Sequence, residues 1–286
     1  MEELKAFLVK LMFCQGISNI GRLKLLNYCL ENQRTALSMN EMIQIAKLFR
    51  TKAIFEESFA EADLLVKQNT RSYFTILDEI YPEALKEINN PPVLLFYQGD
   101  LSLLAQRSLA VVGSRVSSTY GQKVLKQLIP GMVFCGFVVV SGLAKGIDGL
   151  AHKMTIANDG QTIAVIGNGI DCCYPKENQA LQDKIKQEHL LLSEYPDGVP
   201  PRKYHFPMRN RIIAGLTWGT CVIEARQRSG SLITAQLASE EGREVFAVPG
   251  DILSGQSTGC LELIQDGAKC IMEIGDIIDE FEYFRT

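Results

Sequence analysis

The chain has 286 residues, of which 47% are hydrophobic and 22% charged, and its formal net charge is −4 at pH 7. This composition predicts a soluble globular protein with one large or two unequal domains. No apolar run reaches the roughly 18 residues that a membrane helix needs, so we expect a cytoplasmic protein that does not contact the membrane. Because the whole chain is acidic, any contact with nucleic acid must come from a localised basic patch.

Eight cysteines are scattered along the chain, without a C-x-x-C pair and without a matching histidine spacing. This pattern predicts reduced thiols and no metal site, and we expect no cofactor. Cys172 and Cys173 are adjacent, so they form either a redox-active pair or two neighbouring structural thiols. The sequence favours the structural interpretation, because buried free cysteines commonly behave as small apolar residues.

The first segment, residues 1–70, lacks strand signals and shows the spacing of amphipathic helices, so it predicts a small all-helical domain. The apolar residues that share a helical face are Met42, Ile45, Ala46 and Phe49 in one helix and Phe55, Phe59, Ala62 and Val66 in another. Residues 16–21, between the first two helices, loosely resemble the helix-hairpin-helix pattern whose backbone amides hold a DNA phosphate. A plain inter-helix turn explains the same glycine, serine and asparagine residues better.

Residues 71–107 are expected to connect two domains, because prolines at 82, 91 and 92 interrupt short apolar runs. Within this connecting region, residues 93–97 are predicted to form an edge strand. From 108 to 286 the pattern changes to short, branched apolar runs separated by helical stretches. The expected strands are 109–112, 138–140, 163–166, 190–192, 221–223 and 245–248. This alternation predicts an α/β fold with a mostly parallel sheet, helices on both faces and ligands at the carboxyl ends of the strands.

Three glycine-rich loops follow expected strands, at residues 113–115, 141–148 and 167–171. Glycine lets backbone N–H groups approach an anion closely, and Arg115 and Lys145 add positive charge. The G-x-G-x-x-G fingerprint does not follow the first strand, and no G-x4-G-K-[ST] motif occurs. The loops therefore predict a phosphate-binding face that is neither a standard dinucleotide site nor a P-loop.

A basic stretch lies at residues 204–211, where aromatic and cationic side chains surround Pro207. Proline is common at the first position of a helix, so Pro207 is expected to begin one and to put residues 209–211 in its first turn, which favours anions. From 198 to 239 the only acid is Glu224. The basic residues of this range are Arg202, Lys203, Arg209, Arg211, Arg226 and Arg228. The pattern indicates a site for a polyanion with bases, although a solvated basic surface has the same composition.

Six segments now carry a resemblance to the DprA (Smf) DNA-processing family, in order and spacing. They are Gly113-Ser114-Arg115, residues 141–148, Tyr174-Pro175 with Asn178, residues 205–211, Ser229-Gly230-Ser231 and residues 245–250. The resemblance implies an extended Rossmann-like domain that binds single-stranded DNA without sequence preference, protects it, dimerises, and loads a RecA-type recombinase onto it during natural transformation. It also implies that the helical segment is a sterile-alpha-motif-like module. Unlike many members, the chain ends near Thr286 without a winged-helix domain.

By this resemblance, Arg115 holds the DNA backbone, Lys203, Arg209 and Arg211 grip phosphates, and Phe206 stacks on a base. Asn210 would position a phosphate or a base edge. The full set of candidate DNA-binding residues is Ser114, Arg115, Lys145, Lys176, Arg202, Lys203, His205, Phe206, Arg209, Asn210 and Arg211. His205 either orients a phosphate or packs against the sheet.

After residue 239, acidic residues outnumber basic ones and alternate with apolar side chains. Such a region repels DNA and suits a protein partner. The resemblance places residues 260–270 in the dimer-forming region, near the recombinase. The candidate interface residues are Leu237, Leu263, Ile264 and Cys270.

Catalytic residues are scarce, with only three histidines and no nucleophile elbow, so the sequence predicts a binding protein without enzymatic activity. The alternative is a Rossmann-like nucleotide enzyme of the phosphoribohydrolase type, which carries a Gly-Thr pair and a glutamate. Gly219-Thr220 and Glu224 match it, but residues 216–218, Leu-Thr-Trp, replace the glycine pair expected before them. We expect Glu224 to shape the pocket by pairing with an arginine.

Overall fold

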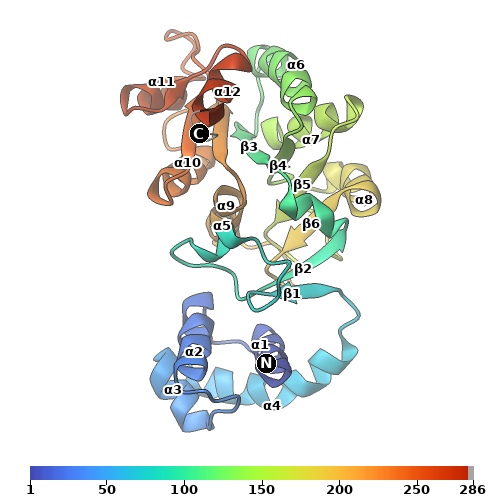
Figure 1. Ribbon diagram of the computed structural model, residues 1–286, viewed down its shortest axis with the longest axis vertical. Coiled ribbons are helices and arrows are strands. Elements are labelled where there is room, and N and C mark those ends of the chain that lie inside the picture. Colours follow the sequence, from blue (N-terminus) through green and yellow to red (C-terminus); the bar gives the residue numbers. More distant parts are fainter. Residues whose placement is uncertain (283–286) are drawn as a thin grey trace.

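The computed structural model describes residues 1–282, so the last four residues of the predicted 108–286 domain lie outside it. A helical domain at the N-terminus packs against one end of a larger domain built on a single sheet (Figure 1). The α-helices are α1 (Glu2–Met12), α2 (Asn19–Glu31), α3 (Met39–Ala46), α4 (Lys52–Gln68), α5 (Glu83–Lys86), α6 (Thr119–Phe134), α7 (Ile147–Ala157), α8 (Gln179–Glu188), α9 (His205–Leu216), α10 (Gly230–Glu240), α11 (Thr258–Gln265) and α12 (Gly275–Glu282).

The sheet has nine strands in the order β1-β2-β6-β5-β4-β3-β7-β8-β9. The strands are β1 (Tyr73–Thr75), β2 (Leu94–Gly99), β3 (Ser108–Gly113), β4 (Val138–Ser141), β5 (Thr162–Ile166), β6 (Leu190–Ser193), β7 (Gly219–Glu224), β8 (Glu244–Ala247) and β9 (Lys269–Cys270). From β6 through β9 all neighbours are parallel, whereas β2 pairs antiparallel with both β1 and β6. All six predicted strands of the α/β part are present, which confirms the fold class.

The region predicted as a connection is part of the sheet. Residues 73–75 and 94–99 form β1 and β2, and β2 pairs with β6 on one side and β1 on the other. The prediction of an edge strand at 93–97 is therefore wrong, because β1 covers that edge. The chain can enter the sheet here despite its prolines because Pro91 and Pro92 precede β2 and remove no hydrogen bond from its ladder.

Helices cover both faces of the sheet (Figure 1), as the buried strands predicted. On one face α9 and α10 pack through Ile213 and Ala235 against alternate strand residues such as Val112. On the opposite face α6 and α7 pack through Leu125 and Ile147. Because α6 follows β3 and α10 follows β7, the chain leaves two neighbouring strands toward opposite faces, which creates a topological switch point between them.

The helical domain shares a core with the sheet domain. Leu4 and Leu8 of α1 belong to the same buried cluster as Leu94 and Phe96 of β2. At the start of α2 the Asn19 amide donates to the carbonyl of Pro91, 2.7 Å away. The turn at residues 16–21 therefore ends in a helix N-terminus that lies against the sheet domain, and the Ser18 hydroxyl caps it by accepting from the N–H of Gly21. This geometry supports the plain inter-helix turn.

Candidate functional site

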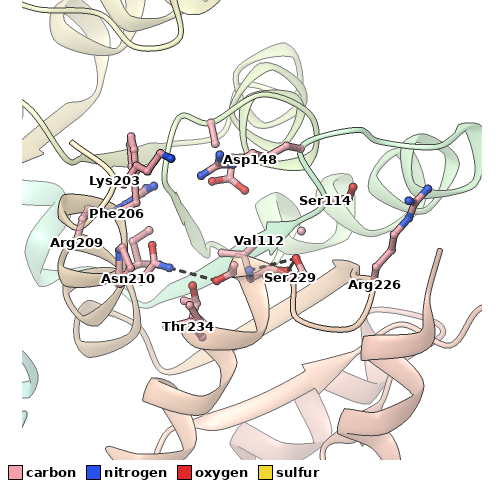
Figure 2. Close-up of a pocket in the computed structure, with 18 of the residues that line it drawn as sticks. Val112, Ser114, Asp148, Lys203, Phe206, Arg209, Asn210, Arg226, Ser229 and Thr234 are labelled. Atoms are coloured by element: carbon pink, nitrogen blue, oxygen red, sulfur yellow. Dashed lines mark hydrogen bonds between the residues drawn. The ribbon is translucent and has the colours of Figure 1, made fainter. Parts of the chain in front are cut away.

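A cleft of about 650 Å³ opens at the carboxyl edge of the sheet, at the switch point between β3 and β7. Parallel α/β sheets bind ligands at such a position, because loops diverge there and helix N-termini converge. The lining residues come from the β3–α6 loop, α7, the loop before α8, α9, the β7–α10 loop and α10 (Figure 2). The predicted site residues that line the cleft are Ser114, Arg115, Lys203, Phe206, Arg209 and Asn210.

Two of the three predicted glycine-rich loops meet at the cleft. The N–H of Ser114 donates to the carbonyl of Glu224 at 2.7 Å, and the Ser114 carbonyl accepts from the N–H of Ile147 at 3.1 Å. Gly146 has a φ of +74°, and a Cβ there would lie 2.2 Å from the Ser114 carbonyl oxygen, so only glycine fits. These contacts fix the loop that carries Arg115. The third loop, residues 167–171, does not line the cleft.

Arg115 belongs to an aromatic stack on one wall of the cleft. Its guanidinium carbon lies 5.5 Å from the centre of the Phe206 ring, within range of a cation–π contact. The ring of Tyr174 lies 5.6 Å from that of Phe206 at an angle of 33°. Arg115 forms no ion pair among residues 1–282, so its charge remains available to an anion. The wall thus presents a cation and an aromatic surface together.

Arg209 occupies the floor of the cleft and is 5% exposed. Its Nη1 donates to the carbonyl of Val165 at 2.8 Å, while its guanidinium lies against Gly142, where a Cβ would be 1.6 Å from Nη1. Burial lowers the pKa of Arg209 to about 10, and the Asp148 carboxylate opposes that shift. Burial likewise raises the pKa of Asp148, against the Arg209 charge. The floor is therefore a buried pair of opposite charges, open to the cleft on one side.

Arg211 does not lie in the cleft, which contradicts its predicted contact with phosphate. Its Nη2 donates to both carboxylate oxygens of Glu194, at 2.6 and 2.7 Å, and the two side chains are only 7% and 6% exposed. The reason is helix geometry, because α9 begins at His205 and places Arg211 on its buried face. The prediction that Pro207 begins the helix is also wrong by two residues, so residues 209–211 lie beyond the first turn and its free N–H groups.

His205 packs against the sheet domain, the second of its two predicted interpretations. It is 3% exposed, its Nδ1 lies 2.9 Å from the carbonyl oxygen of Gly167, and its ring stacks on Tyr195 with centres 3.9 Å apart. Burial lowers its pKa, so the ring is neutral at pH 7. A neutral, enclosed imidazole fixes the start of α9 and offers no charge to a phosphate.

The other predicted cations lie outside the cleft. Lys145 forms an ion pair with Glu177, so part of its charge is compensated. Arg202 donates to the Tyr204 hydroxyl at 3.1 Å, and Lys176 is exposed. These three residues surround the cleft without lining it, and they extend the basic surface beyond its mouth.

Several lining residues were absent from the predicted set. They include Tyr174, Arg226, Ser229, Ser231, Ile233 and Thr234. The sequence did contain signals for three of them, since Tyr174 and the two serines belong to the quoted motifs. Ser229 is the N-cap of α10, whose hydroxyl accepts from the N–H of Ser231 at 3.4 Å. Beside it Arg228 has a left-handed φ of +58°, a strained conformation that is rare for arginine.

Glu224, which we expected to pair with an arginine, forms no ion pair among residues 1–282. Its side chain is fully buried and does not line the cleft. One oxygen accepts from the N–H of Ser118 at 2.9 Å, and the other has no partner among the described residues. The carboxylate therefore supports the N-terminus of α6, where the helix dipole favours negative charge.

Two features are absent from residues 1–282. No cluster of three or more histidine, cysteine, aspartate or glutamate side chains could hold a metal ion. No helix in this range is both long and apolar enough to cross a membrane.

A second groove, of about 540 Å³, lies between α10, β8 and α11. Leu263 lines it, while Ile264 is partly buried and packs against the core beneath α9 and α10. Leu237 and Cys270 are half-buried. The acidic side chains of the groove are Glu240, Glu244, Glu262 and Asp266, against a single Arg243. Of the four candidate interface residues, Leu263 alone lines this acidic groove.

Comparison with known proteins extends these observations. The family model for DNA recombination-mediator protein A matches residues 72–282. The DNA processing protein DprA of Streptococcus pneumoniae is 49% identical over 271 residues, which cover 94% of this chain and 95% of that protein. DprA of Bacillus subtilis is 48% identical over 201 residues, which cover 70% and 68%.

Solved structures agree with the sequence comparison. The crystal structure of Streptococcus pneumoniae DprA matches with a TM-score of 0.89 and 46% identity, over 98% of each chain. The Helicobacter pylori DNA processing protein A, studied for its single-stranded DNA binding mode, matches with a TM-score of 0.66 and 29% identity, over 75% of this chain and 97% of that one. By its fold, its cleft motifs and these matches, the chain belongs to the DNA recombination-mediator protein A family, the DprA (Smf) proteins.

Proposed function

We propose that the cleft binds single-stranded DNA without sequence preference. The observation that supports this most directly is the wall formed by Arg115, Lys203 and Phe206, where unpaired cations stand beside an aromatic face. Cations neutralise any phosphate and an aromatic ring stacks on any base, so such a wall does not distinguish sequences. Among residues 1–282, the only acid that lines the cleft is Asp148, which is buried and feels the opposite charge of Arg209. The single-stranded DNA binding studied in the Helicobacter pylori relative is in keeping with this proposal.

The first test separates charge from stacking. Arg115→Ala should weaken binding of all oligonucleotide sequences alike and flatten the log–log salt dependence by about 0.7, the value for one phosphate contact on a single strand. Phe206→Ala should cost about 1–3 kcal/mol of binding free energy and leave the salt slope nearly unchanged. Fluorescence anisotropy with labelled oligonucleotides over a range of salt concentrations measures both quantities.

Arg50→Ala is the matched control, because Arg50 is an exposed arginine between α3 and α4 of the helical domain and does not line the cleft. It should leave both the affinity and the slope unchanged. Binding by Arg115→Ala that equals the wild type at moderate salt, with an intact fold, would remove the β3–α6 loop from the DNA site.

We further propose that the protein protects incoming single strands and loads a RecA-type recombinase onto them during natural transformation. The family description as a recombination mediator supports this role. The acidic groove between α10 and α11 suits a protein partner, because it repels DNA and lies apart from the basic cleft.

In this proposal the protein has no turnover, and Glu224 is a structural carboxylate. Release of free base from nucleoside monophosphates, abolished by Glu224→Gln, would instead support the phosphoribohydrolase alternative.

Self-association through the same region is the third part of the proposal. Ile264→Arg should shift a homodimer toward monomer, because a buried interface charge without a partner is unfavourable. Sedimentation velocity measures this shift. Ile264 also packs against the core of its own chain, so thermal melting must accompany the measurement. A variant that melts like the wild type and still sediments like it would exclude Ile264 from the interface.

A further inference from the structure

The wall of the cleft opposite Phe206 is formed by the β7–α10 loop and the first turn of α10. Arg226 lines this wall and is exposed, with only its Nε bonded, to the side-chain oxygen of Gln256 at 2.9 Å. No carboxylate lies within ion-pair distance of Arg226 in the described part of the chain. Its terminal guanidinium nitrogens can therefore donate to a ligand, beside the N–H groups at the start of α10.

The two walls present positive charge to each other across the cleft. In Figure 2, Lys203 and Phe206 lie on one side and Arg226 on the other, with Ser114 and Ser229 between them. A nucleotide within a strand carries one phosphate on each side of its sugar, so it presents two anions where the cleft presents two cationic walls.

The floor between the walls holds a donor without a partner. Arg209 lines the cleft and is 95% buried, and its Nε has no hydrogen-bond partner within residues 1–282. A buried donor of this kind is costly unless something bonds it. That nitrogen is enclosed, so a ligand reaches it only if the guanidinium shifts. The size of the occupant is indicated instead by the cleft volume of about 650 Å³ and by the Phe206 ring, which suit a nucleotide with its base better than a phosphate ion.

We propose that the cleft takes one nucleotide of the strand as a unit, with one flanking phosphate against Arg115 and Lys203 and the other against Arg226 and the start of α10. This inference rests on the proposed DNA binding and adds to it a recognition unit, the nucleoside 3′,5′-bisphosphate. Arg226 becomes a phosphate-binding residue of the second wall.

Competition experiments test directly whether the cleft recognises a nucleoside 3′,5′-bisphosphate. A labelled thymidine oligonucleotide is displaced, at constant ionic strength, by thymidine 3′,5′-bisphosphate, thymidine 5′-monophosphate or inorganic pyrophosphate. The bisphosphate should displace it at a concentration about tenfold lower than the monophosphate does, which corresponds to one additional charge-assisted contact. Pyrophosphate is highly charged but has no nucleoside, so it should compete more weakly than the bisphosphate.

The variant Arg226→Ala assigns the second phosphate. In this variant the bisphosphate and the monophosphate should displace the oligonucleotide at nearly equal concentrations. In Arg50→Ala the tenfold ratio of these concentrations should remain. Equal competition by both nucleotides in the wild type, or an unchanged ratio in Arg226→Ala, would overturn the inference while leaving oligonucleotide binding intact. Failure of the wild type to bind the oligonucleotide at all would instead refute the proposed function. The wild-type comparison stands even where the variant folds poorly.

Discussion

Arg211→Ala is expected to destabilise the folded protein by about 3–5 kcal/mol, because it leaves the Glu194 carboxylate buried without its partner. Both carboxylate oxygens accept from the same guanidinium nitrogen, and the two side chains are almost completely enclosed. Urea unfolding followed by circular dichroism measures the loss. The double variant Arg211→Met with Glu194→Leu should recover most of it, since an apolar pair can replace a buried ion pair at little cost.

Lys184→Ala provides a matched control for this prediction. Lys184 and Glu188 also form an ion pair, at 3.6 Å, but the two side chains are 47% and 55% exposed. Solvent screens such a pair, so its removal should cost less than about 1 kcal/mol. If Arg211→Ala proved no more destabilising than Lys184→Ala, the buried pair would have no special role in stability.

Gly142→Ala is expected to destabilise the protein by about 1–3 kcal/mol, as overpacking of a buried site does. The added methyl group would lie 1.6 Å from Nη1 and 2.4 Å from Cζ of Arg209, so the guanidinium must leave the floor of the cleft. Its bond to the Val165 carbonyl would break, and Asp148 would lose its compensating charge. Urea unfolding measures the loss of stability.

A double-mutant cycle tests whether the clash with Arg209 causes the destabilisation by Gly142→Ala. In an Arg209→Ala background, Gly142→Ala should cost less than about 0.5 kcal/mol, because the clash is gone. Gly230→Ala is the control in the wild type, since its added Cβ meets no atom within 4 Å and its φ is not positive. If the changes in unfolding free energy caused by Gly142→Ala and Arg209→Ala were strictly additive, the added methyl group would not clash with the Arg209 side chain.

The sequence predicted the parallel part of the sheet because its strands are buried on both faces and are therefore continuous apolar runs. It missed β1 and β9, which have three and two residues and carry too little pattern to detect. It assigned residues 93–97 to an edge because the partners of that strand are distant in sequence. The pairing of Phe96 with Ser193 joins residues that no local pattern connects.

The sequence predicted which segments contribute residues to the candidate site, but not how deeply each side chain is buried. The resemblance assigned contacts with the DNA backbone to Arg115, Arg209 and Arg211 alike, yet the structure exposes the first and buries the other two. Burial depends on partners that the counted range excluded, since Glu194 precedes it and Asp148 is earlier still. Arg226 was counted as a basic residue but was not chosen, because only the fold brings the β7–α10 loop opposite Phe206.

The charges at each end of α10 have the same sign as the end of the helix dipole beside which they lie. Arg226 and Arg228 precede its N-terminus, and Glu240 and Glu241 stand at its C-terminus. Each such charge next to the like-signed end of a helix costs about 0.3–1 kcal/mol, so this arrangement does not serve helix stability. The same charges and the helix dipole add up to one electric field that runs from the cleft, at its positive end, to the acidic groove, at its negative end. An approaching polyanion is attracted toward the Arg226 end and repelled from the other, so the field orients encounters before any contact forms and raises the association rate at low ionic strength.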